Sequence, residues 1–349
     1  MRKWGVVVAA LGLLMLVGAA VLSFVLVPNG QQLPADTDEK IQYAGTLTAL
    51  DPAALLSGEA DAEDAVVRDL PVTVDRRLEV LETDENRARV VDSSVITATD
   101  SGETVSEREF FYAIDRKTMH AVPSFTDEPV EDAEGLVVGF PIGSEKLNYV
   151  GWVQEAEDTA HVMYAGEDEL RGLAVYKYGG QFSGVPTPDQ IPGAPTSLPK
   201  DQLAGLLEAV DAPADLQDQL GAALPLLPDD IPLAYTYSTD DSYTVEPTTG
   251  IIVDMTKAST ISVGMAGLPD VTFPIVESTV GYTPANVVNE VARAQDSLDQ
   301  IRLYGTTIPL VLLGLGVVAL VASVPMMRHR RRTEVPPPST APRPPAMSV

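Results

Sequence analysis

Two long apolar stretches, one at each end of the chain, constrain its fold more than any other feature. The first runs from Val6 to Val27 and the second from Ile308 to Met327, and neither contains a charged residue. A helix needs about 20 consecutive apolar residues to cross the hydrocarbon core of a bilayer. Residues 28–307 between them are as polar as a soluble domain. The sequence therefore predicts one spanning helix at each end of a large central domain.

Basic residues beside the two stretches predict the orientation. Arg2 and Lys3 precede the first stretch, and an Arg-rich run at 328–332 follows the second. Lys and Arg next to a span favour the cytoplasm. We therefore expect a plasma-membrane protein with cytoplasmic ends at 1–5 and 328–349, spans at 6–27 and 308–327, and an extracytoplasmic domain at 28–283. The tail after Arg332 is rich in proline and is expected to be disordered.

The first stretch could also be a cleaved signal peptide. Its apolar run of 22 residues is longer than the roughly 7–15 residues usual for such a peptide. The sequence Leu26-Val27-Pro28-Asn29 offers no cleavage site between small residues. We therefore expect an uncleaved anchor.

The central domain is strongly acidic. The whole chain carries a net charge of −27. Seven Lys or Arg and one acid lie outside residues 28–307, which leaves 16 basic against 49 acidic residues inside, a net charge of −33. Such a surface repels nucleic acid and anionic lipid headgroups, so no nucleic-acid partner is expected.

The residues that usually carry chemistry are scarce. The chain has no cysteine and three histidines, and neither His120 nor His161 has a nucleophile motif beside it. Asp240-Asp241 lacks the glycine and terminal glutamate spacing of a calcium loop. No phosphate-binding or dinucleotide motif occurs. We therefore expect a protein that is not an enzyme, with no catalytic residues, no metal site and no cofactor.

The central domain is predicted to be α+β and mainly antiparallel β, with a helical insertion at 201–227. Segments rich in β-branched and aromatic residues, separated by polar turns, favour strands. The expected strands are 70–74, 89–99, 109–114, 161–165, 173–178, 233–237, 243–246, 250–256, 260–264 and 271–281. Turns are expected at 166–169, 238–241 and 246–250.

An amphipathic helix is predicted at 284–307, just before the second span. Thr283 and Pro284 suit the N-cap and the first helical position. One apolar stripe runs along an otherwise polar helix and is formed by Val287, Val291, Ala294, Leu298 and Ile301. We expect this stripe to be covered, either by the central domain or by a second copy of the chain. A homo-oligomer through residues 284–303 is therefore a candidate assembly.

One segment stands out as a candidate binding site. It combines glycines, a proline and aromatic residues with a single basic side chain, and its candidate ligand-binding residues are Gly139, Phe140, Pro141, Lys146, Tyr149 and Trp152. The cluster is read either as core packing around a turn or as the wall of an apolar pocket. Lys146 is most simply paired with a nearby carboxylate.

The chain resembles a family of actinobacterial envelope proteins sometimes labelled porin PorA-like. The resemblance covers nearly the whole chain, including both spans, and excludes the Pro-rich tail. It rests on Gly45-Thr46-Leu47, Val72-Thr73-Val74-Asp75-Arg76-Arg77, Ile114-Asp115-Arg116-Lys117-Thr118, Gly139-Phe140-Pro141-Ile142-Gly143-Ser144-Glu145-Lys146 with Tyr149 and Trp152, Leu173-Ala174-Val175-Tyr176-Lys177-Tyr178, and Val245-Glu246-Pro247-Thr248-Thr249-Gly250-Ile251-Ile252-Val253-Asp254. The family implies a location in the envelope and the two-span architecture.

These observations favour a two-span envelope protein whose outer domain binds or passes an apolar molecule, with membrane lipid as the expected partner. A porin-like or channel-forming assembly is the first alternative, although two helices cannot line a pore without oligomerising. A scaffold without a ligand is the second. An apolar cavity in the outer domain would favour lipid handling, and a solid core would favour the scaffold.

Overall fold

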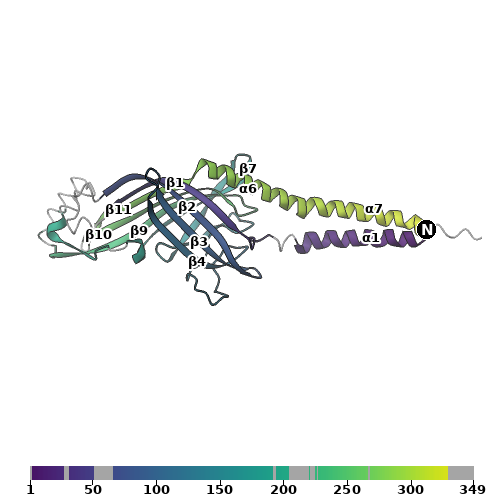
Figure 1. The fold of residues 1–349 in the computed structure, drawn as a ribbon, viewed down its shortest axis with the longest axis horizontal. Helices are drawn as coiled ribbons and strands as arrows, with labels where there is room; N and C mark the ends of the chain where they lie inside the picture. The colour runs from purple at the N-terminus through teal and green to yellow at the C-terminus, as the bar shows by residue number, and fades with distance from the viewer. Residues whose placement is uncertain are drawn as a thin grey trace, which may run out of the picture. The chain divides into compact units, whose positions relative to one another are not determined.

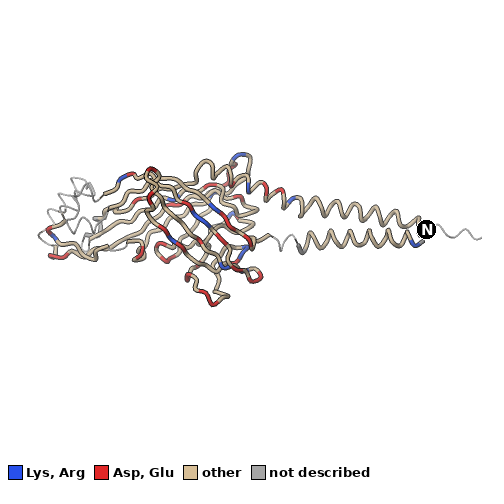
Figure 2. The backbone as a smooth tube through the Cα atoms, viewed as in Figure 1, with Lys and Arg blue, Asp and Glu red and all other residues tan. Residues whose placement is uncertain are grey.

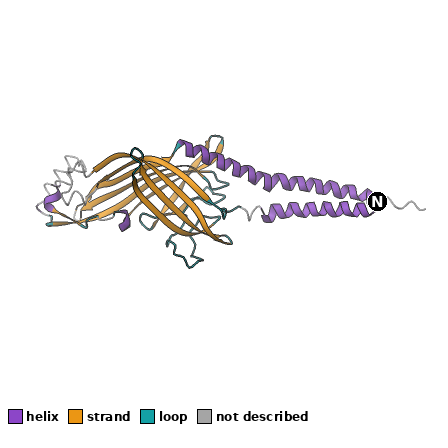
Figure 3. Ribbon diagram, in the orientation of Figure 1, coloured by secondary structure: helices purple, strands orange, loops and turns teal. Residues whose placement is uncertain are grey.

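The computed structural model describes residues 2–26, 31–50, 66–191, 194–203, 220, 225, 227–265 and 268–328. The chain divides into two compact units, one made of residues 1–30 and 299–349 and the other of residues 31–298. The first unit is helical and the second is mainly antiparallel β (Figure 3), which confirms the α+β prediction. Most of the predicted helical insertion at 201–227 lies outside the described residues.

The terminal unit contains the two predicted apolar helices. Helix α1 (Arg2–Val21) continues into a π-helical turn, and α7 (Ile308–Arg328) follows another. Both are long and apolar enough to cross a membrane, and most of their side chains are exposed. The two helices pack closely where Gly12 faces Gly316, because a Cβ added to Gly12 would lie 2.8 Å from the Gly316 carbonyl oxygen. Small residues permit such an approach between spanning helices.

One antiparallel sheet dominates the second unit (Figure 1). Its strands follow the order β4-β3-β2-β1-β11-β10-β9-β7-β6-β5, with β8 paired to β9. Strands β1 and β11, the first and last along the chain, are neighbours in the sheet, with Gly45 of β1 opposite Val280 of β11. The strands are β1 (Asp38–Leu50), β2 (Val66–Asp84), β3 (Arg87–Ala98), β4 (Thr104–Asp115), β5 (Tyr149–Val153), β6 (Asp158–Leu170), β7 (Leu173–Gly184), β8 (Ser197–Pro199), β9 (Asp230–Val245), β10 (Ile252–Met265) and β11 (Leu268–Tyr282).

The sheet curls so that its two walls face each other. Leu78 and Val90 of β2 and β3 share a buried cluster with Val162 and Tyr178 of β6 and β7, although β1, β11, β10 and β9 separate them in the sheet. We call the side of the sheet that carries these residues the inner face. A second apolar cluster lies towards the other ends of the strands and includes Ile231 and Val263.

The two edges of the sheet, β4 and β5, are linked at one end through irregular backbone. Residue Ile114 of β4 pairs with Ala121, and Leu136 pairs with Gly151 of β5. His120 pairs with Leu136 and completes the path. The segment 135–152, which stood out in the sequence, therefore helps to close the curled sheet.

Two predicted turns are wrong. The acidic residues 166–169 belong to β6, and the hairpin turns instead at Arg171-Gly172, where both residues have positive φ angles of 52° and 82°. Such a pair suits the tight turn that matches strand twist. Residues 238–241 lie within β9, because they pair with β10 on one side and β7 on the other. Thr239 points to the inner face and is buried. The turn at 246–250 is confirmed: Gly250 has a φ of 74°, and the Glu246 carboxylate accepts bonds from the backbone N–H groups of Thr248 and Thr249.

The predicted amphipathic helix is α6 (Pro284–Arg302). The Thr283 hydroxyl caps it by accepting a hydrogen bond from the Asn286 N–H at 3.1 Å, as its position predicts. Val291 and Ala294 are buried in a cluster with side chains of β7 and β10, with Leu298 packed against it. Within residues 31–298, the apolar stripe of the helix is therefore covered by the sheet of the same chain. The homo-oligomer through residues 284–303 stays a prediction.

Candidate functional site

The sequence-predicted site centres on Phe140, which is 5% exposed. Its ring lies 4.7 Å from that of Tyr178, 5.3 Å from Tyr243 and 5.9 Å from Tyr149, measured between centroids. Pro141 follows it, and its carbonyl accepts the Ser144 hydroxyl. The space where Gly139 would carry a Cβ is open. These aromatic rings pack against one another and fill the end of the curled sheet where β4 and β5 are linked.

The other predicted residues take two positions. Trp152 packs against the same apolar cluster, and its indole N–H donates to the Gln154 side chain at 2.8 Å. Lys146 instead is exposed and forms an ion pair with Glu167, which raises its pKa. The structure thus brings Phe140, Tyr149 and Trp152 together and leaves Lys146 outside that cluster. Their role in ligand binding stays a prediction.

A different set of polar side chains lies on the inner face, between the two apolar clusters. The first part is an ion pair between β2 and β3, in which the Arg76 guanidinium donates two hydrogen bonds of 2.7 Å to the Asp92 carboxylate. Burial alone would lower the pKa of Arg76, but Asp92 and Tyr43 raise it well above its ordinary value. Arg76 therefore stays charged inside the domain.

The second part lies on β9, β10 and the residues after β5. The Lys257 ammonium donates to the Glu155 carboxylate at 2.7 Å. Burial raises the pKa of Glu155, but the charge and hydrogen bond of Lys257, a backbone hydrogen bond and the charge of Arg108 together outweigh burial, and the net shift is downward. Asp241, opposite Lys257 in the strand register, accepts hydrogen bonds from the Thr239 and Tyr243 hydroxyls at 2.6 and 3.0 Å. Burial raises the pKa of Asp241, although Lys257 opposes that shift.

Tyrosines surround these charges. Burial raises the pKa of Tyr112 of β4. The negative charges of Asp92, Glu131 and Glu155 raise it further. Tyr237 is 3% exposed, and the Lys257 ammonium lies 6.0 Å from the centroid of its ring. We call this set the polar belt: Tyr43, Arg76, Asp92, Tyr112, Glu155, Tyr237, Asp241, Tyr243 and Lys257.

The belt remains accessible even though it lies on the inner face. The Arg76 and Asp92 side chains are 18% and 19% exposed to solvent, and the Lys257 and Glu155 side chains are 26% and 22% exposed. These side chains face the interior of the curled sheet and are only partly shielded from solvent. The belt can supply paired charges and hydroxyl groups to a molecule that reaches them. Among the described residues no group of His, Cys, Asp and Glu is arranged to hold a metal ion.

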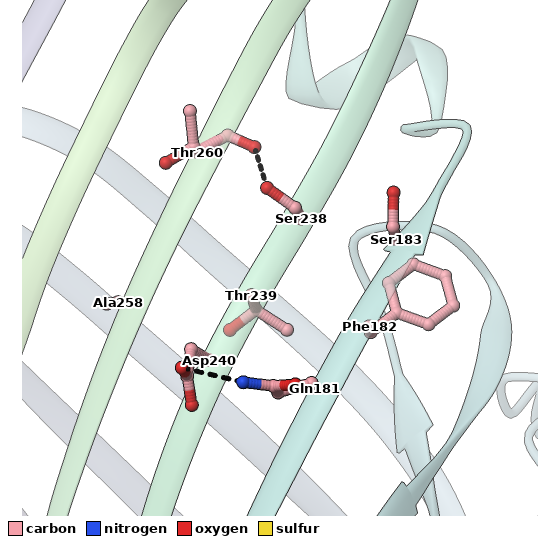
Figure 4. A pocket seen from close by; sticks show the side chains of 8 residues that line it. All are labelled: Gln181, Phe182, Ser183, Ser238, Thr239, Asp240, Ala258 and Thr260. Carbon is pink, nitrogen blue, oxygen red and sulfur yellow. Dashed lines mark hydrogen bonds between the residues drawn. The ribbon is translucent and has the colours of Figure 1, made fainter.

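A pocket of about 510 Å³ lies on the opposite side of the same strands (Figure 4). It lies over β7, β9 and β10, and most of its lining residues are polar. The Gln181 side chain donates to Asp240 across it at 3.0 Å, and Ser238 and Thr260 also line it. It is an open depression, not an enclosed cavity, so it cannot shield an apolar ligand from water.

Sequence reasoning missed the belt because its residues look like ordinary polar residues in the sequence. The sequence pattern predicts a turn that includes Thr239 and Asp241, and it places Lys257 between two separate strands. Acidic positions are spread over loops and strands throughout the domain (Figure 2). The missing signal was the alternation Tyr237, Thr239, Asp241, Tyr243, which has the period of a strand.

Comparison with known proteins gives one strong match. The family model described as porin PorA matches residues 4–324. No protein among those with curated descriptions matches. The similar solved structures include Rv2717c from M. tuberculosis, with 8% identity over 69% of this chain and 91% of that one and a TM-score of 0.23. Another is an acyl-CoA hydrolase from Agrobacterium tumefaciens, with 10% identity over 72% and 98% and a TM-score of 0.15.

Likenesses at such TM-scores carry no argument about function. The family match is of another kind, because it covers most of the chain and both apolar helices. It confirms the resemblance drawn from the sequence. The protein is therefore a membrane protein that belongs to the porin PorA family.

Proposed function

We propose that the curled extracytoplasmic sheet of this protein contains a hollow that holds an amphiphilic envelope molecule, a lipid, and that the protein has no enzymatic activity. The observation that carries the proposal is the accessible polar belt between two apolar clusters on one inner face. An amphiphile has the matching distribution, with a polar group for the belt and an apolar part for the flanking side chains. Curled sheets that enclose a hollow commonly hold one such ligand.

The family name favours a channel as the second candidate, and an accessible polar belt would also suit a polar solute. A sheet that crossed a membrane would need an apolar outer band. The outward positions of β1 and β9 are instead polar and exposed, as at Lys40, Gln42, Thr236, Asp240 and Ser242. A pore would therefore require several copies of the apolar terminal helices.

Photo-crosslinking tests lipid binding in the full chain. We expect benzoylphenylalanine at Tyr243, on the inner face, to form lipid adducts in native membranes, detected by mass spectrometry. The same residue at Ser242, the next and outward-facing position, is the matched control and should give none. Absence of adducts at both positions, together with ion conductance of the purified chain in planar bilayers, would favour the channel instead.

The orientation is a separate part of the proposal and rests on Arg2, Lys3 and the Arg-rich run at 328–332. We expect reporter fusions at Pro34 and Ser348 to lie on opposite sides of the plasma membrane, with Ser348 cytoplasmic. Paired fusions of alkaline phosphatase and green fluorescent protein measure this. If both sites report the same side, one helix does not span.

A further inference from the structure

The curled sheet is closed unevenly along the line where β4 and β5 face each other, which we call the seam. At one end the seam is joined by backbone: the Val122 N–H donates to the Ala113 carbonyl and the Trp152 N–H to the Leu136 carbonyl, at 2.9 and 2.8 Å. Further along, the Glu131 N–H donates to the Phe111 carbonyl at 2.7 Å. This end of the sheet has a continuous hydrogen-bonded wall.

Beyond Phe111 the joint changes in kind. Within the described part of the chain, no backbone hydrogen bond joins the free edge of β4 between Thr104 and Phe110 to another segment. Side chains make the connection instead. The Arg108 guanidinium donates to the Gln190 side chain, and at the border of the backbone-joined wall the Tyr112 hydroxyl donates to the Gln154 side chain at 2.7 Å. Every other neighbouring pair along the sheet order is joined by a backbone ladder.

The segment on the far side of this joint is itself attached to the belt. Gln190 belongs to a short 3₁₀ turn, η2 (Pro188–Gln190). Just before that turn, the Thr187 N–H donates to the Glu155 carbonyl at 2.9 Å. Arg108 also acts on the belt, because its charge contributes to the lowered pKa of Glu155. The side-chain part of the seam is therefore attached next to Glu155 of the belt.

We infer that this part of the seam is the lateral entrance to the proposed hollow, latched by the Arg108–Gln190 hydrogen bond and bordered at its closed end by Tyr112–Gln154. The inference rests on the proposed function and adds the route by which the ligand reaches the belt. A side-chain hydrogen bond is exchanged for bonds to water at small net cost, whereas parting a strand ladder breaks many backbone bonds at once. The seam is thus the place where the wall opens most readily, and a molecule that enters there meets the polar belt first.

A reversible lock tests the entrance. The native chain has no cysteine, so Arg108→Cys with Gln190→Cys can be joined by a reducible bismaleimide. The full chain in nanodiscs also carries benzoylphenylalanine at Tyr243 and receives alkyne-tagged palmitate. We expect the lock to lower the initial rate of adduct formation at least tenfold, and reduction of the linker to restore it.

The matched control places the same linker where the wall is already firm. Gln42 and Asp75 are register partners on β1 and β2, and their exposed side chains are hydrogen-bonded at 2.9 Å. Linking Gln42→Cys to Asp75→Cys should leave the rate unchanged. If the lock at the seam also leaves the rate unchanged while adducts form, the entrance lies elsewhere and the binding proposal stands. If palmitate gives no adduct even in the unlinked chain, while no native lipid is captured at Tyr243 either, both proposals fail.

Discussion

Replacing Lys257 by methionine is expected to destabilise the sheet domain by about 2–3 kcal/mol at neutral pH. Removing one partner of a buried ion pair typically costs about 3–5 kcal/mol because it leaves the other charge uncompensated. The lower figure applies because Lys257 and Glu155 keep about a quarter of their exposure. Asp241, which also interacts with Lys257, loses its compensating charge at the same time. Denaturant unfolding of the full chain in detergent, followed by tryptophan fluorescence, measures the change.

The pH dependence of this variant identifies the cause. In the native protein the pKa of Glu155 is lowered, so its contribution to stability is present above its unfolded pKa and is lost as the pH falls through the folded pKa. Without Lys257, burial raises the pKa of Glu155, and protonation then relieves the penalty. The difference in unfolding free energy between the two proteins should therefore shrink between neutral pH and pH 4.

Lys146→Met supplies the control, because it removes the same charge from an exposed ion pair with Glu167. It should change stability little, since exposed pairs contribute little. Equal loss in both variants, or a loss at Lys257 that does not depend on pH, would show that the charge of the belt is not responsible.

Val291→Asp in α6 is the second change with a large expected effect, about 3 kcal/mol or more. Val291 is 4% exposed in the cluster that joins α6 to β7 and β10, and an unpaired carboxylate buried there is costly. Val288→Asp is the matched control on the same helix, because Val288 is 45% exposed. It should change stability by no more than about 0.5 kcal/mol. The same unfolding measurement applies, and similar stability of the two variants would mean that the sheet does not hold the helix.

The parts of the fold that local sequence determines were predictable. Unbroken apolar runs indicated α1 and α7, and Thr283-Pro284 indicated the start of α6. Most strands rich in β-branched and aromatic residues were predicted, although the predicted segments are shorter than the strands of the structure; β1, β5 and β8 were not predicted. The acidic stretch 166–169 was misread because strand membership there depends on pairing with β7, which no local pattern reports.

The site was less predictable, because it depends on contacts between distant segments. Phe140, Tyr149 and Trp152 were singled out for their composition, and the structure packs them together. The belt needed the curl of the sheet to bring Glu155 of one segment to Lys257 of another, 102 residues away. A lone lysine or a pair of aspartates in a strand gives no sign of such a partner when read from the sequence.

The pairing of β1 with β11 has a consequence for how the protein is made. Gly45 and Val280 are opposite each other yet are separated by most of the domain, so the centre of the sheet cannot form until the last strand has been synthesised. The hairpins β2–β3 and β6–β7 join nearby residues and can form earlier, since local contacts close fastest. Because α6 and α7 follow β11 directly, the sheet is completed at about the time that the second apolar helix leaves the ribosome. Until then β1 presents an unpaired edge, and the growing chain needs protection from aggregation during this interval.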